Sequence, residues 1–324
     1  VYTPFWKALD ARGVPDALAP PERLKAPTEW PGSEDLAGWR LGAAMNRGAP
    51  VLAAHAVVGE AAALARLERF LGQKVQSYKQ DRDIPAKDAV SGLSENLTYG
   101  EIGPRRIWHA AQALTGDGPT HFRKELVWRD FAHHLMFHTP RLLDANWRED
   151  WDRFPWAGDS KAAEAWRRGL TGEPFVDAGL RQMFVTGRMH NRVRMIVASY
   201  LCKHLMTHWK IGSAWFDDCL TDWDPASNAM GWQWVAGSGP DAAPYFRVFN
   251  PATQAEKFDS EGAYRKTFIA ELSRNPGPEA LAYFDAVPRS WGLDPASAYP
   301  RPLVDLATGR ERALEAYAAM RAPS

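Results

Sequence analysis

Apolar residues recur with helical spacing from Glu60 onward, and alternating strand patterns are almost absent. The first such face runs from Leu64 to Leu71, and Gly72 is expected to cap it. Gly103 followed by Pro104 predicts another helix start. Further helices are predicted near residues 121–138, 160–168, 175–186, 188–209, 212–220, 256–273 and 310–320. The sequence therefore predicts an all-α fold.

The first part of the chain has a different composition. It is rich in Pro, Gly, Ala and charged residues, and its prolines are spaced too closely for long helices: Pro15, Pro20, Pro21, Pro27 and Pro31. We predict an extended linker over residues 1–55, with short helices at best, and one helical domain over residues 56–324. The chain starts at Val1 without an initiator Met, which suggests a processed piece or a domain of a longer protein.

Composition excludes several classes of protein. Lys plus Arg and Asp plus Glu balance at 39 each, which weakly disfavours a nucleic-acid binder but leaves room for a local basic face. No apolar run approaches the roughly 18 residues of a membrane span, and the start does not resemble a signal peptide. Two cysteines, Cys202 and Cys219, cannot form a disulfide framework or a four-cysteine metal site. We therefore expect a cytoplasmic protein with no metal and no membrane partner.

Two short segments combine side chains that make a poor core. Asn191, Arg194 and Met195 share one face of a predicted helix, and an amide, a guanidinium and a thioether together suit a pocket for a flat ligand. The alternative is a helix edge with a salt-bridged Arg. Asp222 and Asp224 lie beside a proline, where carboxylates more often cap helices or shape turns. No catalytic triad order, zinc spacing or Gly-rich phosphate loop is present, so this inventory favours a large aromatic cofactor.

Longer motifs make the interpretation specific. The segments are residues 189–195 (MHNRVRM), 222–224 (DWD), 231–234 (GWQW) and 241–251 (DAAPYFRVFNP), with 125–131 (ELVWRDF), 91–94 (SGLS) and 78–85 (YKQDRDIP) upstream. Together they resemble the photolyase/cryptochrome family from about residue 60 onward, and most closely the FAD-binding domain of a class I/III-type cyclobutane pyrimidine dimer photolyase. Residues 1–55 look like that family's interdomain connector, and its N-terminal α/β antenna domain is absent from this chain.

The resemblance implies a helical domain that holds FAD in a folded, U-shaped conformation. The cofactor residues that it implies are Tyr78, Ser91, Leu93, Ser94, Phe122, Arg129, Asn191, Arg194, Asp222, Asp224 and Asn228. Arg194 would pair with Asp222, and Asn228 would face the flavin N5 atom, where signalling members often carry Asp or Cys. Val90 and Phe122 replace a common Thr and a common Trp. Arg188 stands where the family nearly always has a bulky aromatic residue.

The resemblance also implies a lesion pocket and a DNA face. Glu125, Asn191 and Asn228 would have catalytic roles. The DNA and lesion contacts that it implies are Arg82, Glu125, Trp128, Asn191, Arg192, Met195, Trp234, Arg247 and Lys257. Two indoles and a thioether suit a slot for flipped-out bases. The branch that repairs (6-4) photoproducts has His at positions 191 and 195, and the branch that prefers single strands tends to have Tyr at 128 and 234. Surface charge without a DNA role is the alternative for Lys257.

Three of the 15 tryptophans match the family's electron-transfer chain, with Trp232 nearest the flavin, then Trp209, then Trp156 at the surface. Core packing is the alternative use of each alone. The implied function is a deoxyribodipyrimidine photo-lyase, a carbon–carbon lyase that acts as a monomer on UV-damaged DNA. A cryptochrome-type photoreceptor is the alternative. A third reading is a fragment that folds but works poorly without its antenna domain.

Overall fold

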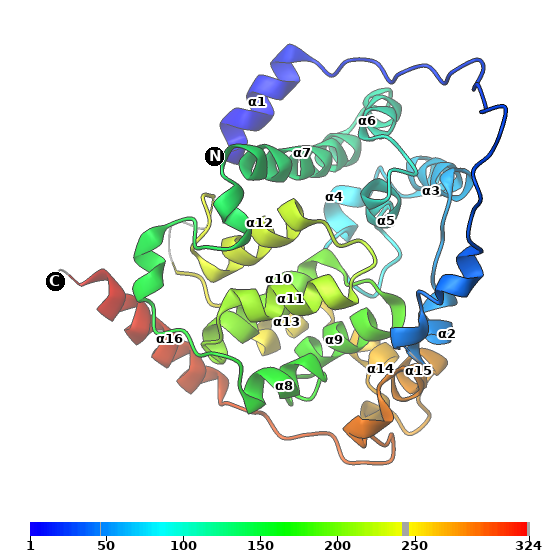
Figure 1. Ribbon diagram of the computed structural model, residues 1–324. Coiled ribbons are helices and arrows are strands. Elements are labelled where there is room, and N and C mark those ends of the chain that lie inside the picture. The colour runs from blue at the N-terminus through cyan, green and yellow to red at the C-terminus, as the bar shows by residue number, and fades with distance from the viewer. Residues whose placement is uncertain (46, 242–245, 323–324) are drawn as a thin grey trace.

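The computed structural model describes residues 1–45, 47–241 and 246–322, and within these ranges the fold is helical (Figure 1). In chain order the helices are α1 (Tyr2–Arg12), α2 (Gly48–Ala53), α3 (Glu60–Gln73), α4 (Tyr78–Asp81), α5 (Ser94–Thr98), α6 (Pro104–Gln112), α7 (Asp117–His138), α8 (Lys161–Arg167), α9 (Pro174–Thr186), α10 (Asn191–Ser199), α11 (Trp209–Cys219), α12 (Pro225–Ala236), α13 (Pro251–Phe258), α14 (Ala263–Phe268), α15 (Pro278–Ala286) and α16 (Leu306–Arg321). A single isolated bridge, between Ala157 and Thr207, is the only β pairing among the described residues. The prediction of an all-α fold is confirmed.

Two apolar clusters make up most of the interior. The larger combines side chains of α8 to α14, including Trp166, Trp209 and Trp232. The smaller combines side chains of α3, α6 and α7 with Tyr78 and Leu93. Helix α12 packs against α7, α10 and α11, so it lies where the two clusters meet. No helix in the described ranges has the length and apolar character needed to cross a membrane.

The predicted linker contains one longer helix than expected. Helix α1 packs on α7, and Figure 1 shows the chain then running along the outside of the molecule towards α2. Residues 13–35 form no helix, as the proline spacing predicts. Helix α2 packs against α9 and α15. The division at residue 55 stays a prediction.

The single helix predicted over residues 188–209 is wrong. Helix α10 passes into a π-helical turn at Tyr200–His204, and Met206 adopts a left-handed conformation with φ of 57°. The Met206 carbonyl accepts from the Ala157 amide, and the His208 amide donates to the Ala157 carbonyl. These bonds to a distant segment end the helix, and Trp209 begins α11 instead.

Two other predicted segments have different boundaries, and one helix was not predicted. The Asp259 carboxylate accepts from the amides of Tyr264 and Arg265, so residues 256–273 divide into α13, α14 and a 3₁₀ turn. Helix α3 continues past Gly72 to Gln73. Helix α12 was not predicted, because small and apolar residues surround it on most sides and leave no amphipathic period.

Candidate functional site

Helix α12 begins with a side-chain cap. The Asp224 Oδ1 atom accepts from the Ser227 amide at 2.7 Å, and Pro225 occupies the first helical position. The second Asp224 oxygen lies 3.1 Å from His133 Nε2 on α7. Arg129 is half-buried one turn earlier on α7, and its carbonyl lies 2.9 Å from His133 Nδ1. Asp224 therefore fixes the start of α12 and its position against α7.

The exposed side of α12 carries Asn228 and, three residues later, Gly231. The Asn228 amide nitrogen donates to the carbonyl and the hydroxyl of Ser213 on α11, at 3.1 and 3.0 Å. These bonds leave its oxygen as an acceptor. A Cβ atom built at Gly231 would meet no other atom within 4 Å. Open space thus adjoins a fixed amide on this face of α12.

Arg194 and Asp222 form an ion pair beside this face. Arg194 Nη2 lies 2.9 and 2.8 Å from the two Asp222 oxygens, and its Nε donates to the Met189 carbonyl at 2.8 Å. The Asp222 side chain is only 7% exposed. The predicted pair is present, and charge-assisted bonds of this kind fix the orientation of both groups.

The residues predicted to hold the FAD phosphates and ribityl chain lie on α4, on α5 and in the segment between these helices: Tyr78, Ser91, Leu93 and Ser94. Tyr78 and Phe122 are buried with ring centroids 5.6 Å apart, and burial raises the pKa of the Tyr78 hydroxyl. Ser91 Oγ accepts from the Leu93 amide at 3.4 Å, and Ser94 is exposed at the first position of α5. Thr98 Oγ1 donates to the Asp222 carbonyl at 3.2 Å, which joins α5 to the ion-pair segment.

This set of residues fits FAD chemically. Hydroxyls at a turn suit phosphates, a carboxylate suits a ribose or a ring N–H, and a guanidinium and an amide suit the polar edge of an isoalloxazine. Gly231 is exposed on α12 between Asn228 and Trp232 in the sequence, and the space beside its backbone is open. A flat ring system can approach the α12 backbone there because no side chain intervenes.

The structure accounts for Arg188, which the sequence did not explain. Its guanidinium donates to both oxygens of Glu95, at 2.7 and 2.6 Å, and to the His55 carbonyl at 2.8 Å. Glu95 also accepts from Arg66 at 3.1 Å and from the Thr221 hydroxyl. We call Arg66, Glu95, Arg188 and Thr221 the Glu95 network. It connects the neighbours of Ser94, Met189 and Asp222, and thus three segments of the candidate cofactor site.

Burial alone would raise the pKa of Glu95. The hydrogen bonds from Arg188 and Thr221 and the charge of Arg188 outweigh burial, so the pKa of this carboxyl lies below its ordinary value. Glu95 therefore stays ionised and holds both guanidinium groups at neutral pH. No motif in the sequence indicates Glu95, His133 or Ser213, and Gly231 stands out only as part of the motif over residues 231–234. Only the position of Glu95 next to Ser94 could have suggested its role.

The predicted lesion residues lie on α7, α10 and α12. Glu125 and Trp128 are one turn apart on α7, and Trp128 packs at the cluster that contains Ala229 and Met230 of α12. Asn191 is exposed at the start of α10, while Met195 and Trp234 are partly buried against the larger core. Trp234 also lines a small recess with Arg247 and Phe249.

Two of the predicted DNA-binding arginines are paired with carboxylates. Arg82 forms an ion pair with Glu125, and Arg192 Nη2 lies 2.6 Å from Asp83 Oδ2. The Arg192 guanidinium also covers the Phe258 ring at 4.7 Å, and the neighbouring Lys257 ammonium lies 5.1 Å from the same ring. Asp83 thus lies near both Arg82 and Arg192, and Phe258 near both Arg192 and Lys257. Arg247 lies over the Phe249 ring at 5.7 Å.

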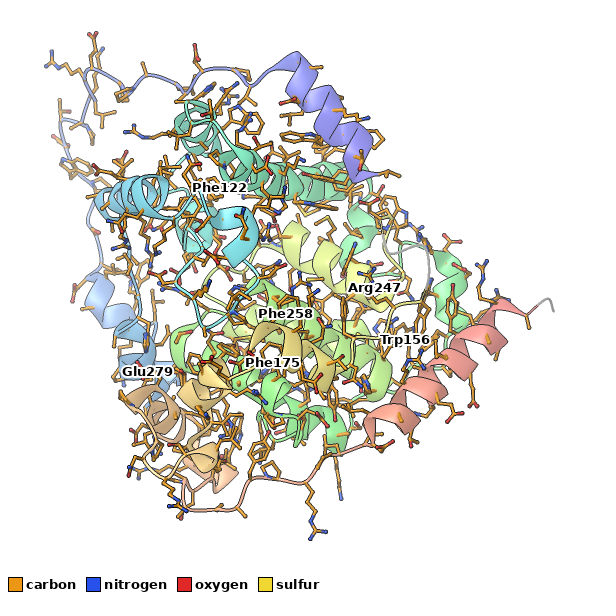
Figure 2. The ribbon with its side chains drawn as sticks, turned by 180° about the vertical axis from the view of Figure 1, so that it is seen from behind. Phe122, Trp156, Phe175, Arg247, Phe258 and Glu279 are labelled. Carbon is orange, nitrogen blue, oxygen red and sulfur yellow. The ribbon has the colours of Figure 1, made fainter. Side chains whose placement is uncertain are left out.

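Of the three predicted electron-transfer tryptophans, Trp209 and Trp232 are buried in the larger core and Trp156 is partly buried against it. Trp232 is buried against α11, where one of its ring atoms would come within 2.1 Å of a Cβ at Gly212. Trp209 begins α11 and donates from Nε1 to Asn146 at 2.8 Å. The His208 ring lies between Trp209 and Trp156, with centroid distances of 5.5 and 5.2 Å. Trp156 is half-buried beside α16, as Figure 2 shows.

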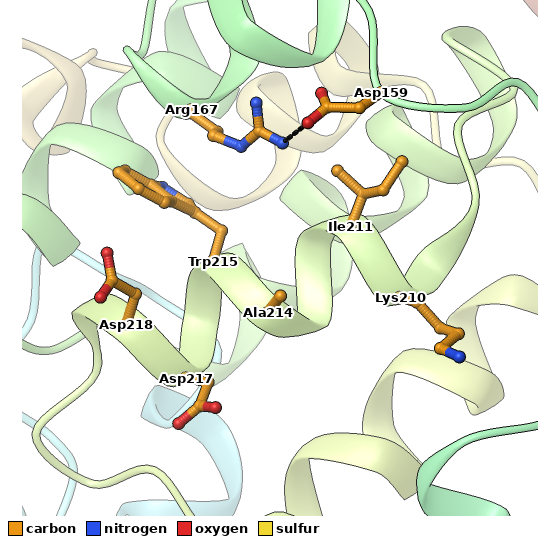
Figure 3. Close-up of a pocket in the computed structure, with 8 residues that line it drawn as sticks. All are labelled: Asp159, Arg167, Lys210, Ile211, Ala214, Trp215, Asp217 and Asp218. Carbon is orange, nitrogen blue, oxygen red and sulfur yellow. Dashed lines mark hydrogen bonds and ion pairs between the residues drawn. The ribbon is translucent and has the colours of Figure 1, made fainter.

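A broad open pocket of about 690 Å³ lies away from these residues. It follows the outer face of α11 and is lined by Lys210, Ile211, Ala214, Trp215, Asp217 and Asp218, with Asp159 and Arg167 opposite (Figure 3). Arg167 pairs with Asp159 at 2.6 Å across its edge. None of the predicted cofactor or lesion residues lines it, so this pocket is separate from the candidate site.

Comparison with known proteins agrees with this geometry. Residues 122–319 match the family described as the FAD binding domain of DNA photolyase. The chain is 47% identical to a deoxyribodipyrimidine photo-lyase of Agrobacterium fabrum, over 99% of this chain and 69% of the relative. It is 37% identical to the deoxyribodipyrimidine photo-lyase of Escherichia coli, over 99% of this chain and 68% of that relative. It therefore spans about two thirds of the length of these relatives.

Solved structures show the same relationship. A class III photolyase from Agrobacterium tumefaciens superposes with a TM-score of 0.88 at 46% identity, covering 99% of this chain and 68% of that one. A Synechocystis cryptochrome superposes with a TM-score of 0.69 at 33% identity, covering 81% of this chain and 57% of the cryptochrome chain. A helical fold with a flavin-compatible site defines the class. This chain belongs to the DNA photolyase FAD-binding family.

Proposed function

We infer that this chain is the catalytic domain of a deoxyribodipyrimidine photolyase, which uses light and FAD to repair cyclobutane pyrimidine dimers in UV-damaged DNA. One observation carries the inference for this molecule. Helix α12 holds Asn228 and Gly231 next to the Arg194–Asp222 pair, and it packs on α7, which carries Glu125 and Trp128. Contact between α7 and α12 thus supports placing part of the proposed cofactor site beside part of the proposed lesion pocket.

Bound FAD, reduced and excited by light, would supply the electron that splits the dimer. The chain itself would bind and orient the partners of that transfer. Asp222 and Arg194 would fix one edge of the flavin, and Asn228 would present its carbonyl oxygen to the ring, because its amide nitrogen is held by Ser213. Tyr78, Ser91, Leu93, Ser94, Phe122, Arg129 and Asp224 would line the remainder of the cofactor site.

The lesion would enter from the DNA side as flipped-out bases. Trp128, Trp234 and Met195 would offer an apolar slot, and Glu125 would hydrogen-bond base edges once Arg82 turns towards a phosphate. Asn191 at the exposed start of α10 would contact the lesion from the other side. Tryptophans at positions 128 and 234 favour duplex DNA as the substrate. We also propose that the protein acts as a monomer and works on the bacterial chromosome.

Repair is tested with UV-irradiated oligothymidine under blue light, with reductant present and the flavin content measured. We expect dimers to disappear in the light and to persist in the dark. A protein that holds reduced flavin and leaves the dimers intact would contradict the proposal. If such a protein still photoreduces its flavin, a cryptochrome-type photoreceptor becomes the better interpretation.

Replacing Trp209 by phenylalanine should largely abolish photoreduction of the oxidised flavin, because the indole that links Trp232 to the surface is lost. Repair by chemically reduced protein should be retained, since the chain of tryptophans is not needed when the flavin is already reduced. Transient absorption and a dimer-repair assay measure the two quantities. The matched control is Trp108→Phe, which removes a buried indole in the smaller apolar cluster, away from the proposed chain. Equal photoreduction in the Trp209 variant and the unmodified protein would remove Trp209 from the chain.

Replacing Arg192 by glutamine should weaken binding to damaged and undamaged DNA by the same factor. The slope of log affinity against log salt should fall by about 1, as expected for one lost phosphate contact. Replacing Lys257 by glutamine should lower the same slope if Lys257 contacts a phosphate, and should leave it unchanged if Lys257 is only a surface charge. Titrations of a fluorescent duplex at several salt concentrations provide the measurement, and an unchanged slope would show that Arg192 stays paired with Asp83.

A further inference from the structure

Trp128 is held in place by a residue from the start of the sequence. The ring of Tyr2, in α1, stacks on the indole with a centroid distance of 3.7 Å and an interplanar angle of 2°. The ring of Phe131 meets both of them edge-on, at 6.0 Å from Tyr2 and 5.9 Å from Trp128. One face of the indole and part of its edge are therefore covered by protein.

Tyr2 is itself anchored at two points. Its hydroxyl donates to the Lys124 carbonyl on α7 at 2.8 Å, and its backbone amide donates to Asp241 Oδ2 at 3.3 Å. Burial raises the pKa of this hydroxyl, so it stays a donor at neutral pH. Asp241 begins the motif over residues 241–251. Tyr2 thus joins α1, α7 and this motif at the position of Trp128.

The stack of Tyr2 on Trp128 limits how a flat ligand can bind to the indole. Trp128 remains half-buried, and with Tyr2 on one face a planar ligand can stack only on the opposite face. An indole that is already immobilised also loses less conformational entropy when a base stacks on it. The stack on Tyr2 therefore determines which face of the Trp128 indole a base can contact, and it lowers the conformational entropy that the indole loses on binding.

We propose that Tyr2 is a positioning residue for lesion recognition: it fixes the ring plane of Trp128 so that the uncovered face receives a flipped-out pyrimidine dimer. This inference rests on the proposed function of Trp128. The other use of Tyr2 would be to attach α1 to α7. Phe5 and Trp6 already do so, because Phe5 packs on Phe131 at 5.3 Å and the Lys124 ammonium lies 5.6 Å from the centroid of the Trp6 ring. The two uses can therefore be separated by substitution.

The experiment compares Tyr2→Leu, Tyr2→Phe and the matched control Trp6→Leu in the full-length, FAD-loaded protein. The quantity measured is the ratio of affinities for a duplex with one thymine dimer and for the same duplex without it. We expect Tyr2→Leu to lower this ratio about tenfold, the order of one aromatic stack. Tyr2→Phe should keep most of it, and Trp6→Leu should leave it unchanged.

A double-mutant cycle tests whether Tyr2 acts through Trp128. Adding Tyr2→Leu to Trp128→Leu should cause no further loss of discrimination, whereas two independent contributions would add. An unchanged ratio in Tyr2→Leu, or full additivity, would overturn the inference. If Trp128→Leu itself retains full discrimination, the proposed lesion pocket fails instead. Should Tyr2→Leu not retain FAD, Tyr2→Met replaces it in the same comparison.

Discussion

Replacing Asp222 by alanine should release FAD and lower the free energy of unfolding of the flavin-free protein by about 3 kcal/mol. The carboxylate is 7% exposed and accepts two bonds from Arg194, whose Nε donates to the Met189 carbonyl. Without it a largely buried guanidinium loses its partner. The segment that carries Asp222 loses its ion pair with α10, while Thr221 keeps its bonds to Glu95 and to the Gly187 carbonyl.

Flavin retention is measured by the absorbance ratio after gel filtration, and stability by chemical denaturation without added FAD. The matched control is Asp217→Ala, since Asp217 is exposed on the outer face of α11 and lines the pocket of Figure 3. It should change neither quantity. An Asp222→Ala protein that keeps its flavin would show that the ion pair lies outside the cofactor site.

Replacing Glu95 by glutamine should destabilise the protein by about 3 kcal/mol, because two guanidinium groups then face a neutral amide. Arg66 and Glu95 have side chains only 7% and 10% exposed, so water can do little to compensate. FAD affinity should also fall, since the network joins the segments that carry Ser94, Arg194 and Asp222. Replacing both Glu95 and Arg188 with apolar residues should recover only the part of the stability that is due to Arg188, because Arg66 still lacks its carboxylate partner.

The pH dependence of this effect has a definite sign. The pKa of Glu95 is lowered in the folded protein, so its contribution to stability is complete above the pKa of an unfolded glutamate, about 4.3. That contribution is lost as the pH falls from there through the lower folded value. Denaturation curves between neutral and acid pH should therefore converge for the unmodified protein and Glu95→Gln. A difference that stays constant to the acid limit would show that the charge of Glu95 is not the cause.

Sequence analysis predicted the helices whose apolar faces repeat regularly, such as α3 and α9. It missed α12, although Asp224 and Pro225 are recognisable start signals, because a helix buried on most sides has no polar face. It also extended one helix through Met206. The bonds that end this helix come from Ala157, far away in the sequence, so no local pattern contains them.

In the candidate site, too, some contacts were predictable from sequence motifs and others depend on segments that are distant in the sequence. Motifs identified Arg194 and Asp222 as a pair, and the structure confirms the contact. The partners that hold the site in place were not predictable: Ser213 for Asn228, His133 for Asp224 and Arg188 for Glu95. Each is an ordinary residue in its own segment, and its role depends only on which segment packs beside it.

The sequence by itself determined the all-α class and the family, because these depend on side-chain chemistry and on order along the chain. The residues that it predicts to contact flavin and lesion remain predictions. Only the tertiary structure decided how these residues are supported. The stack of Tyr2 on Trp128 and the contact of Arg188 with Glu95 join residues more than 90 positions apart. Such contacts follow from how helices pack against one another, and packing is a property of the whole chain that local sequence does not encode.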